Sequence, residues 1–150
     1  MLDDFLIHVF HKGNTLEAYK IFGAHLETNN HKKGVRFTVY APNARSVQVV
    51  GDFNDWDGSN HYMEKYTDGG IWTLFIPGVK EKALYKYRIE TQNFATVDRA
   101  DPYAFYSELR PGTASRVYNI ENFRWSDKRW LNARTKNFDK PMNIYEANIG

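Results

Sequence analysis

Three carboxylates crowd into the short stretch from Asp52 to Asp57, and they are the first side chains of this sequence to weigh for chemistry. A calcium-binding loop needs Asp or Asn at alternating positions and a Glu at the twelfth. Counted from Asp52, the fifth position is Trp56 and the twelfth is Met63. The acids make a weak catalytic pair as well, because a loop without an apolar pocket gives no reason for a raised pKa. We interpret Asp52, Asp55 and Asp57 as solvated turn residues.

An indole in the middle of this polar loop, Trp56, is the more unusual feature. Trp carries about 150–250 Å² of surface that normally favours burial. In one interpretation, Trp56 folds back over the edge of its domain or packs against another domain. In the other it is displayed as a platform, because the C–H face of a sugar ring packs on an indole while Asn54 or an Asp binds the hydroxyls. The residues alone leave both interpretations open.

Other catalytic or cofactor chemistry finds little support. The chain has no Cys, which excludes disulfides, thiolate nucleophiles and Cys-based zinc sites. His8 and His11 could share a helix face, but no third ligand follows nearby. Neither a Gly-x-Ser-x-Gly motif nor a phosphate-binding glycine loop is present in the sequence. We expect no metal and no cofactor.

Composition and charge exclude several classes of partner. The net charge is only +2, with dispersed Lys and Arg, so nucleic acid is not predicted. No apolar run approaches about 18 residues, which argues against a membrane span. The N-terminal residues 1–4 are acidic and lack the basic region of a signal peptide. A cytoplasmic protein is the simplest interpretation.

Apolar and polar residues alternate from Gly34 onward, and this pattern predicts a mainly β fold. The predicted strands cover residues 35–40, 46–51, 71–76, 84–90, 94–97 and 117–120. Short strands with turn signals about every 8–12 residues indicate an immunoglobulin-like antiparallel β-sandwich.

The two ends of the chain differ from the strands. Residues 3–10 predict a short amphipathic helix opened by Asp, and residues 16–21 a second helical piece. The predicted organisation is a helical arm (1–30), the sandwich (31–122), a linker (123–141) with a turn of helix from Ser126, and a strand (142–150). That strand has no later partner in the sequence, so it looks like the first strand of a domain that has been cut away.

Five stretches carry the most specific patterns: 19–25 (YKIFGAH), 35–44 (VRFTVYAPNA), 49–58 (VVGDFNDWDG), 83–87 (ALYKY) and 101–115 (DPYAFYSELRPGTAS). Together they resemble the N-terminal region of bacterial 1,4-α-glucan (glycogen) branching enzymes, over nearly the whole chain. The APNA and GDFNxW pieces are shared with isoamylase-type and debranching relatives, whereas the last stretch points more narrowly to branching enzymes. By the same resemblance, residues 143–146 open the family's (β/α)8 barrel, which is truncated here.

The resemblance implies a carbohydrate-binding module of the isoamylase N-terminal and glycogen-binding type, placed before a catalytic barrel. Enzymes of this family cleave an α-1,4 glucan bond, hold the glucan on an Asp and transfer it to a 6-hydroxyl, with a Glu as acid/base. Their catalytic carboxylates lie at the ends of later barrel strands. This segment should therefore carry no catalytic residues and be inactive alone.

The resemblance also implies a glucan site. Modules with this motif in glycogen-targeting regulatory subunits use the equivalent Trp, a Lys on a strand and a second aromatic after the next turn. By position these are Trp56, Lys86 and Phe94, with Asn54 as the hydroxyl-binding neighbour. The family pattern has Trp at the second aromatic position, so Phe94 offers a smaller ring.

An aromatic and proline-rich block follows the strands and suggests an interdomain surface. The residues expected to face the missing barrel are Tyr103, Phe105, Tyr106, Trp125 and Trp130. The simpler alternative is packing between the sandwich and its own linker.

The function expected from the whole pattern is an α-glucan-binding and scaffold module of a glycogen branching enzyme. Its partners would be glycogen or a maltooligosaccharide and the catalytic barrel of the same polypeptide. One alternative is a non-catalytic, immunoglobulin-like domain that packs on a partner or catalytic domain without binding glucan. A small enzyme in its own right is disfavoured, because no set of catalytic side chains converges.

Overall fold

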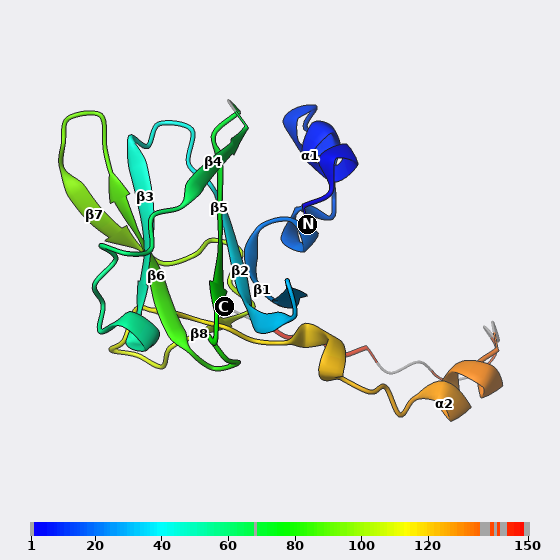
Figure 1. Cartoon of the computed structure of the whole chain (residues 1–150). Helices are drawn as coiled ribbons and strands as arrows, with labels where there is room; N and C mark the ends of the chain where they lie inside the picture. Colours follow the sequence, from blue (N-terminus) through cyan, green and yellow to red (C-terminus); the bar gives the residue numbers. More distant parts are fainter. Residues whose placement is uncertain (1, 68, 136–138, 140, 142–143, 149–150) are drawn as a thin grey trace.

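The computed structural model describes residues 2–67, 69–135, 139, 141 and 144–148. Two antiparallel sheets face each other in it (Figure 1). The first sheet has the strand order β1–β2–β5–β4, and the second β3–β6–β9–β8, with β7 also paired to β6. The strands are β1 Gly23–Asn29, β2 Lys32–Tyr40, β3 Ser46–Gly51, β4 Glu64–Thr67, β5 Ile71–Pro77, β6 Leu84–Glu90, β7 Thr96–Arg99, β8 Tyr106–Ser107 and β9 Ser115–Arg116. The predicted mainly β sandwich is confirmed.

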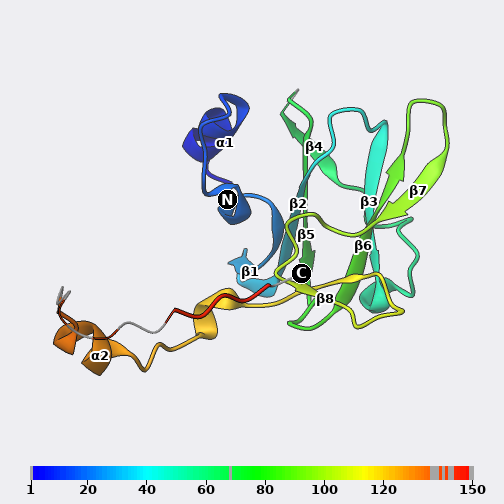
Figure 2. The ribbon, with the colours of Figure 1, turned by 180° about the vertical axis from the view of Figure 1, so that it is seen from behind.

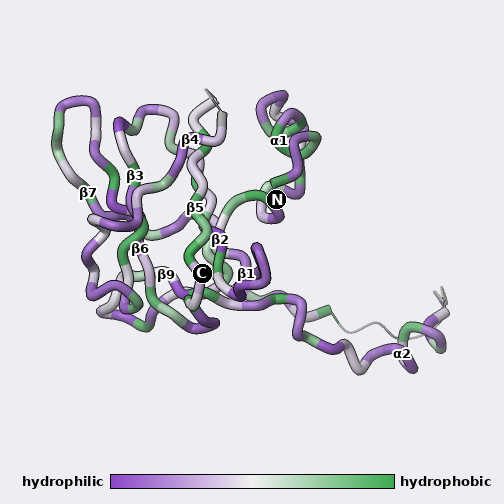
Figure 3. The backbone as a smooth tube through the Cα atoms, viewed as in Figure 1, coloured by the Kyte–Doolittle hydropathy of each residue, from purple (hydrophilic) through white to green (hydrophobic). Residues whose placement is uncertain are grey.

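The core lies between the sheets and is built from alternate strand residues. Phe37 of β2, Val49 of β3, and Tyr85 and Tyr87 of β6 are almost completely buried there. Because successive side chains of a strand point to opposite faces, the intervening residues of β6 lie on the outer surface. Hydrophobic stretches accordingly gather in the strands and the N-terminal arm (Figure 3).

The register of the second sheet decides which side chains share its outer face. β3 and β6 pair so that Gln48 lies opposite Arg88 and Val50 opposite Lys86. β7 then places Asp98 opposite Arg88 on the other side. β3 and the β6–β7 hairpin, which are far apart in the sequence, thus contribute to one outer face, called the outer face of the second sheet below.

The N-terminal arm begins with the predicted helix, α1 (Asp4–His11). Asp3 caps it, because its Oδ1 accepts the backbone N–H of Phe5 at 2.9 Å. Ile7 is buried with Phe22 in a second, smaller apolar cluster. The arm therefore packs beside the first sheet (Figure 1).

The arm is shorter than predicted, since β1 begins at Gly23, inside the stretch (1–30) assigned to it. Within residues 16–21 the structure forms a 3-10 turn, η1 (Ala18–Lys20). Gly23 has a φ of +105°, and a Cβ there would lie 3.0 Å from the carbonyl oxygen of Tyr103. Its conformation and its pairing with β2 along the whole strand are tertiary features, which local alternation does not reveal.

Two later strand predictions need correction. β7 begins and ends two residues later than the strand predicted at 94–97, because Thr91 and Ala95 close the preceding turn through a backbone hydrogen bond. The strand predicted at 117–120 is wrong, since β9 comes before it and a 3-10 turn, η3 (Ile120–Asn122), occupies its end. There the side chain of Asn119 accepts the N–H of Glu121 and starts the turn.

Beyond residue 122 the chain leaves the sandwich, and the helix α2 (Lys128–Ala133) lies apart from the sheets in both views (Figures 1 and 2). Of the predicted strand 142–150, the described residues 144–148 form no strand. Residues 142, 143, 149 and 150 lie outside the described residues. Passage of the linker into a barrel stays a prediction. In the part of the chain that is described, no helix is long and apolar enough to span a bilayer.

Candidate functional site

The loop after β3 is fixed from within by Asn54. A 3-10 turn, η2 (Asp52–Asn54), follows Gly51, whose N–H donates to Oδ1 of Asn54 at 2.8 Å. The Nδ2 of Asn54 donates to the carbonyl of Val49 at 3.0 Å and lies 3.0 Å from Nδ1 of His61. Asn54, expected to bind sugar hydroxyls, is thus placed to hold the loop, because both ends of its amide already face protein groups.

The backbone at Gly58 packs closely against β3, so this loop lies on the outer face of the second sheet. A Cβ on Gly58 would lie 2.4 Å from Oε1 of Gln48 and 3.0 Å from Cγ1 of Val50. Both side chains belong to the outward-facing set of β3. The loop therefore crosses the outer face, which explains why Val50 is buried although it points away from the core.

Trp56 is held in an uncommon backbone conformation and is partly exposed. Asp55 and Trp56 have φ values of 52° and 59°, in the left-handed region that non-glycine residues rarely adopt. The N–H of Trp56 donates to the carbonyl of Gly51 at 2.9 Å, and Nη1 of Arg88 donates to the carbonyl of Trp56 at 3.2 Å. The side chain is 37% exposed, so the indole is neither a buried plug nor fully solvated.

Arg88 ties the Trp56 loop to the sheet, and the sequence analysis did not single it out. Its Nε and Nη2 donate to the two carboxylate oxygens of Asp98 at 2.8 and 3.0 Å. This two-point hydrogen bond lowers the pKa of Asp98 below its usual value and raises the pKa of Arg88. The guanidinium is thereby oriented, and its remaining Nη1 reaches the loop.

Lys86 lies near the start of β6, and Phe94 lies beyond the end of this strand. The Nζ of Lys86 donates to Oγ1 of Thr113 at 2.7 Å. Phe94 stands in the turn between β6 and β7 at a φ of 63° and is 68% exposed. The Cζ of Arg45 lies 3.9 Å from the centre of the Phe94 ring, so a cation–π contact covers one side of that ring.

Two of the loop acids, Asp52 and Asp57, accept hydrogen bonds from backbone N–H groups. Oδ2 of Asp52 accepts the N–H of Leu84 at 3.1 Å. Asp57 accepts both the N–H and the hydroxyl of Ser59, and these hydrogen bonds lower the pKa of Asp57. Asp52 thus connects the loop to the start of β6, whereas Asp57 stabilises the turn at Ser59, and the two acids do not share one site. Among the described residues, no three His, Cys, Asp or Glu side chains are grouped so as to hold a metal ion.

Comparison with known families connects this geometry to a ligand class. The model of carbohydrate-binding module 48 (isoamylase N-terminal domain) matches residues 21–104, which is more than half of the chain. The chain belongs to this family. The matched range contains the Trp56 loop, Lys86 and Phe94, and it ends just before Phe105.

Curated relatives of this family 48 module are much longer proteins. The chain is 50% identical to a 1,4-α-glucan branching enzyme of Bacillus cytotoxicus, over 94% of the chain and 22% of the relative. It is 46% identical to the 1,4-α-glucan branching enzyme of Bacillus subtilis, over 96% of the chain and 23% of the relative. The chain therefore spans less than a quarter of the length of these relatives.

Solved structures of related enzymes contain the same sandwich. The pullulanase of Klebsiella pneumoniae complexed with maltotriose matches with a TM-score of 0.53 and 26% identity, over 67% of this chain and 10% of that one. The pullulanase of Bacillus acidopullulyticus matches with a TM-score of 0.54 and 26% identity, over 67% of this chain and 12% of that one.

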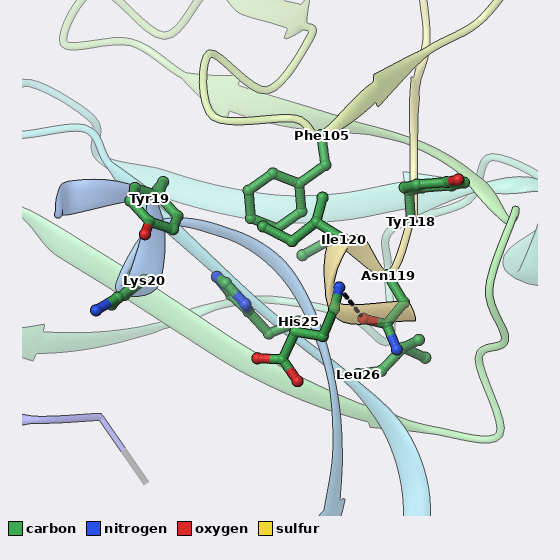
Figure 4. A pocket seen from close by; sticks show the side chains of 10 residues that line it. Tyr19, Lys20, His25, Leu26, Phe105, Tyr118, Asn119 and Ile120 are labelled. Carbon is green, nitrogen blue, oxygen red and sulfur yellow. Dashed lines mark hydrogen bonds between the residues drawn. The ribbon is translucent and has the colours of Figure 1, made fainter. Parts of the chain in front are cut away.

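Apart from the outer face of the second sheet, the module has a pocket at the edge of the first sheet beside β1 (Figure 4). This pocket of about 510 Å³ is lined by Tyr19, Lys20, Ala24, His25, Leu26, Phe105, Tyr118, Asn119, Ile120 and Glu121. The rings of Phe105 and His25 meet edge to face with centroids 5.5 Å apart, and Nε2 of His25 lies 3.0 Å from the carbonyl oxygen of Phe22. Of the expected interdomain residues, Phe105 lines this pocket, and the lining residues of β1 were not predicted as site residues.

Tyr103, expected at an interdomain surface, is partly buried and lies beside a buried network of the module. Asp101 is buried, and its Oδ2 accepts the hydroxyls of Tyr85 at 2.7 Å and Tyr87 at 3.1 Å. Its Oδ1 accepts the N–H of Tyr103 at 2.8 Å, and the Tyr103 ring packs 5.2 Å from that of Phe22. Burial raises the pKa of Asp101, although its hydrogen bonds act in the opposite direction.

The remaining expected interdomain residues are exposed. Tyr106 stacks on Tyr118, with centroids 5.4 Å apart, near the rim of the pocket. Trp125 and Trp130 are 77% and 63% exposed, the first between η3 and α2 and the second in α2. This segment leaves the sandwich (Figure 2). These three side chains are more accessible to another domain than Tyr103, which is partly buried.

Proposed function

We propose that this chain is the α-glucan-binding and scaffold module of a 1,4-α-glucan branching enzyme. The full protein would cleave α-1,4 glucan and transfer the chain to form α-1,6 branches in glycogen synthesis. Membership of a carbohydrate-binding family and the similarity to branching enzymes support this proposal. They favour it over a domain that binds protein alone.

One observation carries the glucan proposal: Trp56 is displayed on the outer face by a strained loop that Arg88 holds in place. A backbone held in the left-handed region at two consecutive residues is the kind of strain found at ligand sites. The glucan would stack a sugar ring on the exposed indole, and Lys86 would donate to its hydroxyls. Asn54 acts indirectly, by keeping the loop in shape.

Binding by this module should be weak. A single indole and a few side chains remove little surface from water, and the ligand loses conformational freedom when it is bound. Phe94 adds less than a Trp would, because its ring is smaller and Arg45 already covers one side. We expect a dissociation constant on the order of 0.1–1 mM for maltoheptaose.

The direct test is electrophoretic retardation of the chain in gels that contain glycogen. Trp56→Ala should abolish most of the retardation, an affinity loss of about ten-fold, because the stacking platform is removed. Phe5→Ala is the matched control, since Phe5 is an exposed aromatic on α1 away from the outer face. Wild-type chain that migrates equally fast with and without glycogen would refute glucan binding by this module.

We further propose that the pocket beside β1 and the exposed Trp125 and Trp130 pack against the rest of the same polypeptide. The pocket lies where the chain leaves the sandwich, since Ile120 and Glu121 line it. A domain tethered at that point would have a high local concentration at this surface. In the full-length protein, His25→Ala and Phe105→Ala should each lower the thermal midpoint of the whole enzyme more than that of the isolated chain. A cytoplasmic location stays our prediction, to be checked by cell fractionation.

A further inference from the structure

A shallow groove continues the outer face of the second sheet beside Trp56. It has a volume of about 230 Å³ and is lined by Ser46, Gln48, Tyr62, Arg88, Glu90 and Thr96. Arg88 both lines this groove and donates to the carbonyl of Trp56. The groove and the Trp56 loop are therefore immediate neighbours.

Among the described residues, two side chains of the groove, those of Tyr62 and Gln48, make no hydrogen bond within the protein. Tyr62 is 53% exposed and lies opposite Gln48 through an isolated β-bridge. The amide of Gln48, which can both donate and accept, and the solvent-exposed ring of Tyr62 are thus available to a ligand.

The charges of the groove are already compensated. Arg88 is paired with Asp98 at two points. Glu90 accepts the hydroxyl of Ser46 at 2.9 Å and lies 3.8 Å from Nε of Arg45. Because no charge is left without a partner, the groove suits a neutral, hydroxyl-rich ligand better than a phosphate or a cation.

We propose that this groove is an additional sugar subsite, in which a glucose unit of a chain stacked on Trp56 packs on the Tyr62 ring and bonds the Gln48 amide. The proposal rests on the glucan-binding function stated above and extends it. The groove is smaller than the roughly 300–1,000 Å³ of drug-sized ligand sites, so it takes one sugar unit and not a whole oligosaccharide. Tyr62 thereby supplies the second aromatic contact that Phe94 provides only in part.

The test is a titration of the ¹⁵N-labelled chain with maltoheptaose, followed by NMR. In the wild type, the side-chain amide of Gln48 and the backbone amide of Thr96 should shift along with the indole signal of Trp56. Tyr62→Ala should weaken binding about three- to ten-fold, and Tyr62→Phe, which keeps the ring, by less than about two-fold. The matched control is Tyr145→Ala, because Tyr145 is exposed and outside the sandwich.

The outcomes separate the two proposals. If the Trp56 indole shifts while the Gln48 amide does not, and Tyr62→Ala binds as the wild type does, the subsite is refuted and the glucan-binding function stands. If maltoheptaose shifts no signal of the wild type, both proposals fail. The wild-type shifts do not depend on any variant, so a Tyr62→Ala chain that unfolds leaves the subsite testable.

Discussion

Two residues of one loop have different roles at the proposed binding site: Asn54 stabilises the loop, and Trp56 would contact the ligand. Asn54 satisfies the N–H of Gly51 and the carbonyl of Val49, which would otherwise lose their partners at the end of β3. Trp56 makes its hydrogen bonds through backbone atoms, so its ring is left for another role. Stability and affinity should therefore respond differently to substitution at these two positions.

Asn54→Ala should lower the free energy of unfolding by about 1–3 kcal/mol, because it removes the partners of partly buried backbone groups. Urea denaturation followed by tryptophan fluorescence would measure the loss. Asn60→Ala is the matched control, since Asn60 is an exposed residue of the same loop region. Equal stability of the two variants would contradict the holding role of Asn54.

The element that organises the module is β6, because each of its faces serves a different purpose. Its inward tyrosines, Tyr85 and Tyr87, close the core and bind Asp101 through their hydroxyls. Its outward Lys86 and Arg88 contribute to the proposed glucan face. One strand thus connects the segment after β7 to the binding surface.

Asp101→Ala should destabilise the chain by about 2–4 kcal/mol, since it removes the acceptor of the buried Tyr85 hydroxyl and leaves that of Tyr87 only its longer hydrogen bond to the carbonyl of Thr38. Tyr85→Phe should cost about 1 kcal/mol in the wild type and less in the Asp101→Ala background, which a double-mutant cycle would show. Additive effects would exclude the coupling of Asp101 to Tyr85.

The pH dependence gives a second measure of Asp101. Its pKa in the folded chain is raised above the ordinary 3.8 by burial, so the folded state binds this proton more tightly than the unfolded state does. The contribution of Asp101 to stability is then greatest below pH 3.8 and declines as the pH rises through the folded-state pKa. Asp101→Ala should lack this decline in denaturation experiments between pH 3 and 8.

At the scale of the whole molecule, the module has two working surfaces: the outer face of the second sheet and the pocket beside β1. The first is lined by mostly polar strand residues and lies beside the Trp56 loop, whereas the second combines aromatic rings with aliphatic and polar side chains. A sugar and a protein domain respectively fit these compositions. If both proposals hold, the module would bind glucan while it packs against the rest of an enzyme.

The isolated chain should be unable to branch glucan. Incubation with amylose should produce no new α-1,6 linkages, because the resemblance puts the catalytic carboxylates in the later barrel. The full-length branching enzyme of Bacillus subtilis is the positive control, and linkage analysis by ¹H NMR is the measurement. Any turnover by this chain would contradict the assignment of catalysis to another domain.

The sequence by itself determined much of this protein. The strands 46–51 and 84–90 were predictable to the residue, because apolar alternation along one strand is a local property. The α1 helix was predicted to within one residue at each end, from Asp3 and the apolar spacing that follows it. The motifs around Trp56 also sufficed for the resemblance to a glucan-binding family.

Only the tertiary structure decided which side chains meet. Arg88 holds a carbonyl 32 positions earlier in the chain, and Tyr62 joins a groove with strands on either side of it in the sequence. Both depend on the register of β3, β6 and β7, which the pattern of a single strand does not encode. For the same reason the sequence pattern did not reveal the hydrogen bonds of Asn54 within its loop or the partial burial of Tyr103 against Phe22.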